Sequence, residues 1–184
     1  VHGQRPEIPE PFVNTYFCVR TCDRLLELAP LVGREDSMPG LRETKRRYVD
    51  AIIKYYFDPQ TGDFAENKNS ANAFALDIGL GDSRTVENFI RHTRFDMPDT
   101  GIFGYDLVVK QLFQRGYFDE AIQYLAREEY PSFGYMMHAG ATTIWEEWKE
   151  PRSMSHPMFG SAVKYLFYDV LGIRQKEGTV GFSS

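Results

Sequence analysis

Apolar residues recur every three or four positions along most of the chain, which is the spacing of an amphipathic α-helix. Glycine ends several of these runs, and proline breaks the chain between others. The helix expected at 70–80 is apolar on every side, which predicts that it is buried. The pattern predicts helices at about residues 17–32, 37–56, 70–80, from 82 or 83 onward, 102–114, 118–127 and 158–171.

Helices joined by short connections are typical of antiparallel helical hairpins, so the sequence predicts an all-α fold. Two architectures fit this pattern, an α-solenoid and part of an α/α toroid. The stretch RGYFDEA at residues 115–121 is similar to one repeat of a helical solenoid. No companion stretch recurs at a period near ~34 residues, which disfavours the solenoid.

Composition indicates a single helical domain over residues 1–184, because 42% of the residues are hydrophobic and 26% are charged. The polar, proline-rich start predicts a linker-like stretch at 1–13, and 174–184 is expected to be a tail. No apolar run approaches the ~20 residues needed to cross a bilayer, so no membrane is expected as a partner. The net charge of −5, with scattered basic residues, argues against nucleic acid as a partner.

One long segment, residues 129–157, does not follow the helical pattern and is rich in aromatic residues and glycine. A connection of this length inside a helical domain is usually functional or disordered, and its composition favours an ordered one. The whole chain holds 14 Phe, 11 Tyr and 2 Trp, more than a small helical core requires. Because aromatic faces are good platforms for sugars or flat ligands, function is expected first in this segment.

The motifs of several common site chemistries are absent from the sequence. It has no Gly-x-Ser-x-Gly, no His-x-x-x-His or Cys-x-x-Cys, and no phosphate-binding loop. No metal site is therefore expected, and Cys18 and Cys22 are interpreted as small apolar core residues. What remains are carboxylates flanked by aromatic residues. These suit glycoside hydrolysis, in which one carboxylate activates water and another protonates the leaving oxygen.

Glu146 is the best candidate among these carboxylates, because it lies between Trp145 and Trp148 and follows the small residues 140–143. Apolar neighbours would keep bulk water away from its carboxylate, as suits a general base. The alternative is an exposed glutamate in a short helix, with both tryptophans in the core. The adjacent Glu147 would point elsewhere, and it is interpreted as a solvated surface residue.

Two further residues are candidates for contact with a sugar. His156 could donate a hydrogen bond to a sugar hydroxyl, or it could cap the following helix or bind a core carbonyl. Phe103 lies in the turn DTGIFG at residues 99–104, which opens a predicted helix. This turn could be a rim loop that brings Phe103 near a sugar, or it could serve only as a helix cap.

These residues carry a resemblance to the C-terminal part of the bacterial α-L-rhamnosidase catalytic domain. The resemblance extends over about residues 15–173, and the GATTIWE segment is its most specific part. The matching stretches are TGIFG at 100–104, GYFDEA at 116–121, YPSFGYM at 130–136, GATTIWEEW at 140–148, SMSH at 153–156 and GSAV at 160–163.

The resemblance implies an (α/α)6 toroid and an inverting hydrolase that removes terminal α-L-rhamnose from glycosides, with no cofactor in the chemistry. It implies that Glu146 is the general base, that His156 contacts the sugar and that Trp145 lies beside the base. The family more often has Arg at position 147, Asn at position 155 and a small polar residue at position 105.

The general acid of this family lies in a motif rich in Asp, Arg and Glu in the first half of the toroid, and nothing in the chain matches it. An inverting enzyme needs both carboxyls, roughly 6.5–9.5 Å apart. The chain is therefore interpreted as the second half of a catalytic domain, whose isolated form hydrolyses rhamnosides poorly or not at all. Apolar edges left without the N-terminal half would favour self-association or binding of that missing segment.

Two other functions remain open at this point. The chain could belong to a different sugar-active α/α toroid, either another hydrolase or a lyase. It could also be a non-catalytic helical scaffold whose aromatic residues bind sugar or protein.

Overall fold

Helices make up all the regular structure in the computed structural model, which describes residues 8–98, 100–149 and 153–175. The predicted all-α fold is confirmed, and the one β-type contact in these ranges is an isolated bridge between Phe57 and Phe64. The chain divides into two compact units, Val1–Phe89 and Ile90–Ser184. The boundary falls inside α4 (Ser83–Phe95). None of the described helices is both long and apolar enough to span a membrane.

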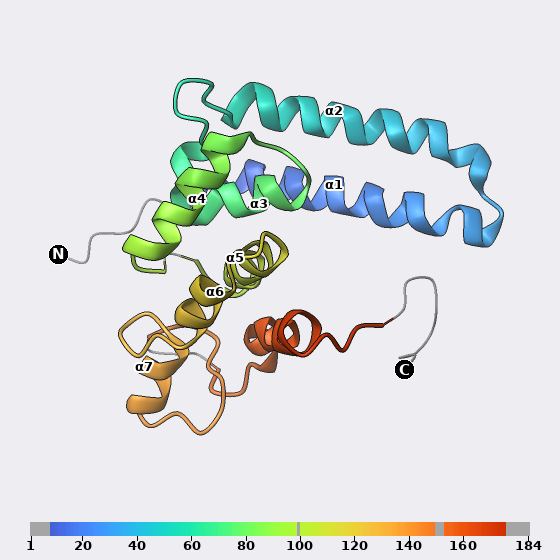
Figure 1. The fold of residues 1–184 in the computed structure, drawn as a ribbon. Coiled ribbons are helices and arrows are strands. Elements are labelled where there is room, and N and C mark those ends of the chain that lie inside the picture. Colours follow the sequence, from blue (N-terminus) through green and yellow to red (C-terminus); the bar gives the residue numbers. More distant parts are fainter. Residues whose placement is uncertain (1–7, 99, 150–152, 176–184) are drawn as a thin grey trace. The chain divides into compact units, whose positions relative to one another are not determined.

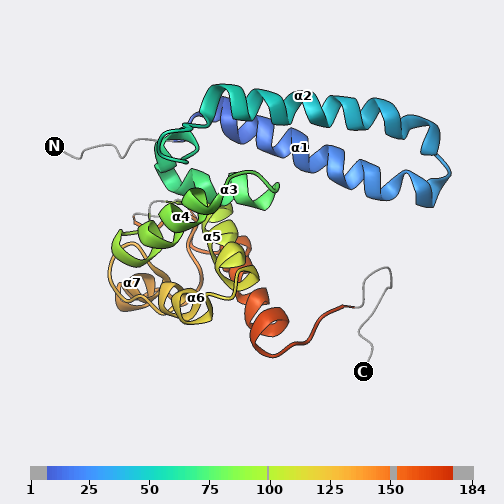
Figure 2. The same ribbon diagram turned by 45° about the horizontal axis from the view of Figure 1, so that its top comes forward.

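The first unit is built on an antiparallel hairpin of α1 (Glu10–Leu28) and α2 (Met38–Tyr56), which lie side by side in Figures 1 and 2. Gly33 turns the chain between them with a φ of 66°, which few other residues adopt without strain. The buried residues of α1 recur at helical spacing, as the sequence predicts. Because α1 begins at Glu10, residues 10–13 of the expected linker-like stretch are helical. The buried positions on α1 are Phe12, Tyr16, Val19 and Cys22.

The small helix α3 (Ala71–Asp77) is buried on every side from Ala71 to Leu76, which confirms the expectation from its composition. Its one buried amide side chain, that of Asn72, is hydrogen-bonded to the preceding loop through both its oxygen and its nitrogen. The side-chain oxygen accepts from the Phe64 N–H at 2.8 Å, and the Nδ2 group donates to Asp63 at 2.8 Å. The helix ends three residues before the predicted boundary, ahead of Gly79, whose φ is 77°.

The second unit contains α5 (Ile102–Gln114), α6 (Phe118–Leu125) and α7 (Phe133–His138). The bounds of α5 are those predicted, and α6 is two residues shorter than predicted. The short helix α7 was not predicted. Ser132 caps its N-terminus, because the Ser132 hydroxyl accepts a hydrogen bond from the Tyr135 N–H at 2.9 Å.

The prediction of a regular α-helix at 158–171 is wrong. The chain instead forms a 3₁₀ helix at Pro157–Val163 and a π-helix at Leu166–Val170. The 3₁₀ stretch packs closely, because a Cβ added to Gly160 would lie only 2.5 Å from Ile144 Cδ1. Side-chain hydrogen bonds from this region to Asp106 of α5 also hold the region in place. Such tertiary contacts override the intrinsic helical preference of a sequence.

Candidate active site

The segment expected to carry function folds back on itself, and hydrogen bonds join its two sides. The Glu146 N–H donates to the Ser153 carbonyl at 3.0 Å, and the His156 N–H donates to the Ile144 carbonyl at 2.7 Å. The Thr143 hydroxyl also donates to the Met154 carbonyl. The structure therefore brings Glu146 and His156, ten positions apart in sequence, onto neighbouring stretches of backbone.

Trp148 anchors this loop in an aromatic cluster at the centre of the second unit. Its Nε1 donates a hydrogen bond to the Thr100 carbonyl at 2.7 Å, just before the first turn of α5. Its ring centroid lies 4.3 Å from that of Phe159, 5.2 Å from that of Tyr105 and 5.3 Å from that of Phe133. Trp148 itself is half-buried, so it packs against the core without lying inside it, and it fixes the position of the glutamates beside it.

Tyr105 lies at the centre of the same cluster and is fully buried. Its hydroxyl donates to the Tyr124 carbonyl at 3.1 Å. Burial raises the pKa of Tyr105 well above its usual range, because the phenolate would lose its hydration. This residue acts here as a packing centre for the loop and not as a contact for a sugar.

Glu146 is half-buried and lies in the loop, not in a helix. Its carboxylate makes no hydrogen bond or ion pair with any residue in the described part of the chain. The backbone therefore holds this residue in place while its side chain stays available for another partner. Glu147 is exposed, in agreement with its interpretation as a surface residue.

The other predicted site residues lie near this loop or near the start of α5. Trp145 and His156 are both half-buried. Phe103 is 57% exposed in the first turn of α5, three residues after the Thr100 carbonyl that binds Trp148. The hydrogen bond from Trp148 thereby links the turn that carries Phe103 to the loop that carries Glu146.

An apolar hollow of 450 Å³ lies beside the loop. The small residues that precede Trp145 form part of its wall, and Glu146 is not among the residues that line it. The lining residues are Phe133, Met136, Met137, Ala141, Thr142, Thr143, Ile144, Gly160 and Val163.

Asp106 is a residue of this region that sequence reasoning missed. Its carboxylate accepts hydrogen bonds from Ser161 Oγ at 2.9 Å, from Lys164 Nζ at 3.0 and 3.1 Å, and from the Tyr165 hydroxyl at 3.2 Å. It ties α5 to the chain that follows His156. The available signal was a lone aspartate within the otherwise apolar run of α5.

Within the described ranges, no group of three His, Cys, Asp or Glu side chains could hold a metal ion. Cys18 and Cys22 are free thiols, and the second is buried. The chemistry available at the loop is therefore that of a carboxylate, an imidazole and aromatic rings.

The described residues form helices, and a loop anchored by Trp148 carries a half-buried carboxylate. A family model described as the bacterial α-L-rhamnosidase six-hairpin glycosidase domain matches residues 2–170. The chain belongs to this family.

Similar proteins agree with this assignment. An α-L-rhamnosidase of Formosa agariphila is 28% identical over 158 residues, which are 77% of this chain and 17% of that protein. The chain thus spans about a sixth of the length of that relative.

Two solved structures share the fold. The α-L-rhamnosidase structure from Dictyoglumus thermophilum aligns with a TM-score of 0.72 and 24% identity, over 83% of this chain and 19% of that one. The native α-L-rhamnosidase structure from Aspergillus terreus aligns with a TM-score of 0.69 and 20% identity, over 82% and 19%. The helical hairpins of this chain therefore form part of a six-hairpin toroid.

Proposed function

We propose that the chain is the part of an inverting α-L-rhamnosidase catalytic domain that supplies the general base, Glu146. The observation that supports this proposal is the environment of the Glu146 carboxylate. It is half-buried, makes no hydrogen bond or ion pair within the described residues, and is held on a loop that Trp148 anchors. A glutamate that stabilised the fold through its carboxylate would be paired with a donor.

In the proposed reaction Glu146 takes a proton from water as the water oxygen bonds to the anomeric carbon of a terminal rhamnose. The bond from that carbon to the glycosidic oxygen breaks, and a second carboxyl gives the leaving oxygen its proton. Attack from the opposite face inverts the anomeric centre. His156 donates a hydrogen bond to a sugar hydroxyl, while Trp145 and Phe103 offer apolar surface to the substrate.

The second carboxyl, the general acid, is proposed to come from a segment outside these 184 residues. Nothing in the sequence matches the acid motif that the resemblance implies, and the chain spans 17% of a curated relative. An inverting pair requires two carboxyls with a water molecule between them. The isolated chain should therefore give little or no turnover of an aryl α-L-rhamnoside. Turnover by the isolated chain at the rate of a complete enzyme would contradict this part of the proposal.

Replacing the base provides the direct test. In a complete enzyme that contains this chain, Glu146→Gln should lower kcat by about 10²–10⁴-fold, because the amide cannot accept the proton. Substrate affinity should change little, since the shape of the side chain is retained. Aryl α-L-rhamnoside hydrolysis measures the rate, and a substrate titration measures the affinity.

Glu147→Gln is the matched control, because it makes the same change at the exposed neighbour. It should leave kcat within about twofold of wild type, since surface substitutions have small effects. If Glu146→Gln keeps the activity of the control, Glu146 is not the base. Ultraviolet-absorbing products in a substrate screen would instead indicate a lyase.

A further inference from the structure

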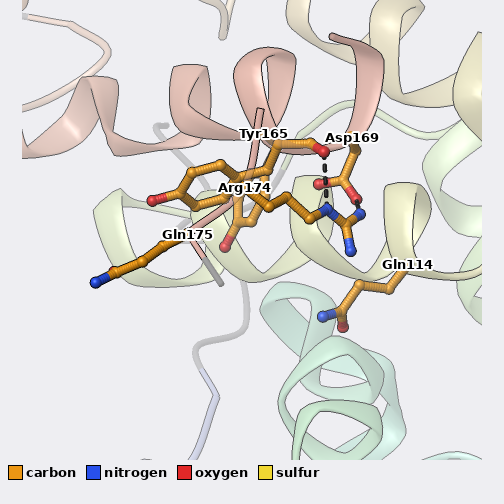
Figure 3. Close-up of a pocket in the computed structure, with 6 residues that line it drawn as sticks. Gln114, Tyr165, Asp169, Arg174 and Gln175 are labelled. Atoms are coloured by element: carbon orange, nitrogen blue, oxygen red, sulfur yellow. Dashed lines mark hydrogen bonds and ion pairs between the residues drawn. The ribbon is translucent and has the colours of Figure 1, made fainter. Parts of the chain in front are cut away.

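A second hollow, about 320 Å³ in volume, lies at the end of α5 that carries Gln114 (Figure 3). Three parts of the second unit form it: the last residue of α5, the π-helical stretch with the residue before it, and the extension that follows. It shares no residue with the candidate active site. The lining residues are Gln114, Tyr165, Tyr168, Asp169, Arg174 and Gln175.

Two bonds orient the guanidinium of Arg174 in the wall of this hollow, while 64% of the side chain is exposed. Its Nε donates to the Tyr168 carbonyl at 2.8 Å, and its Nη2 forms an ion pair with Asp169, whose side chain is only 7% exposed. Both bonds are visible in Figure 3. The charge of the arginine is thus balanced by a nearly buried carboxylate, and these two bonds orient the guanidinium without a ligand.

Three groups around the hollow have unused capacity for hydrogen bonds. Arg174 Nη1 makes no bond to a described residue, and Figure 3 shows it on the side where Gln114 lies. The Gln114 oxygen accepts from Gln111 at 3.4 Å, whereas its NH₂ group has no partner in the described ranges. The Tyr168 hydroxyl is likewise without a partner among those residues.

We infer that this hollow binds one neutral sugar residue. Because Asp169 cancels the charge of Arg174, the site offers an ion no net attraction. Amide, phenol and guanidinium groups match the alternating donors and acceptors of sugar hydroxyls, and tyrosine rings suit the apolar face of a pyranose. The volume is near the lower limit of small-molecule sites, about 300–1,000 Å³.

This inference extends the proposed function by giving the domain a second contact with a rhamnose-containing chain. It rests on the proposed function only for the choice of sugar. Because binding here involves neither Glu146 nor the general acid, it is measurable on the chain as it stands.

The test is a titration of the chain with methyl α-L-rhamnopyranoside, followed by NMR of the amide and side-chain signals. Signals of Gln114 and Arg174 should shift. Gln114→Ala and Tyr168→Phe should each raise the Kd about two- to tenfold, the equivalent of one hydrogen bond. The matched control is Gln123→Ala, an exposed glutamine of α6, which should bind as wild type does.

Several outcomes would overturn the inference. These are the absence of shifts at the hollow, equal affinity in wild type and both variants, or displacement of the sugar by inorganic phosphate, which would indicate an anion site. Glu146→Gln should leave this titration unchanged even where it abolishes turnover. A failure here therefore leaves the proposed base untouched, and a failed base leaves this site untouched.

Discussion

At the scale of single residues, the candidate site depends on two tryptophans with different roles. Both are half-buried, but the indole N–H of Trp148 donates to the Thr100 carbonyl and its ring packs on Phe159. Trp145 makes no hydrogen bond within the described residues. The sequence could not distinguish them, because both flank Glu146 in the same pattern. The partner of Trp148 is Thr100, which is 48 positions away.

The first prediction concerns this difference. Trp148→Phe removes the donor to the Thr100 carbonyl and leaves that acceptor unpaired in the core, so unfolding free energy should fall by about 1–3 kcal/mol. Urea denaturation followed by circular dichroism measures the change. Trp145→Phe is the matched control and should cost clearly less. Equal losses in the two variants would show that Trp148 is not the anchor.

At the scale of elements, the sequence predicted helices well where one face or every face is apolar. The bounds of α5 and the complete burial of α3 followed directly from such patterns. The helix types of the 157–170 region could not be predicted, because the spacing of apolar residues alone does not distinguish α, 3₁₀ and π helices. The bonds from Asp106 to residues 55–59 positions later hold that region, and no local pattern signals them.

Asp106 therefore has a predictable effect on stability. Asp106→Ala removes the shared acceptor of Ser161, Lys164 and Tyr165, and unfolding free energy should fall by about 1.5–3 kcal/mol. Asp106→Asn should cost less, because its side-chain oxygen can still accept from the two hydroxyls. Urea midpoints of the two variants measure the difference. An alanine variant as stable as wild type would contradict this role.

At the scale of the whole molecule, the family and the all-α fold could be predicted from the sequence, whereas the division into two units could not. Each unit exposes large apolar side chains that a core would normally cover. Leu31 is 80% exposed and Val32 68% in the first unit, while Phe95 is 79% exposed and Met137 71% in the second. Such side chains favour association when they lie close together.

We therefore expect the chain to self-associate in solution, or to bind the remainder of the catalytic domain. Sedimentation velocity over a hundredfold range of concentration should show a weight-average mass that rises above 21.3 kDa. The double variant Leu31→Ser and Met137→Ser should reduce that rise in mass. Gln123→Ser, at an exposed polar position, should not. A single monomeric species at every concentration would contradict the expectation.

The paired backbone around Glu146 has one more consequence. Hydrogen bonds between the backbone at 144–146 and at 153–156 close a hairpin at its stem. Because Glu146 lies in this stem, a change in the number of residues at the tip should leave its position unchanged. In general, each doubling of the length of a loop costs only about 0.6 kcal/mol. We therefore expect that new tips can be placed on this unchanged stem without moving the proposed base.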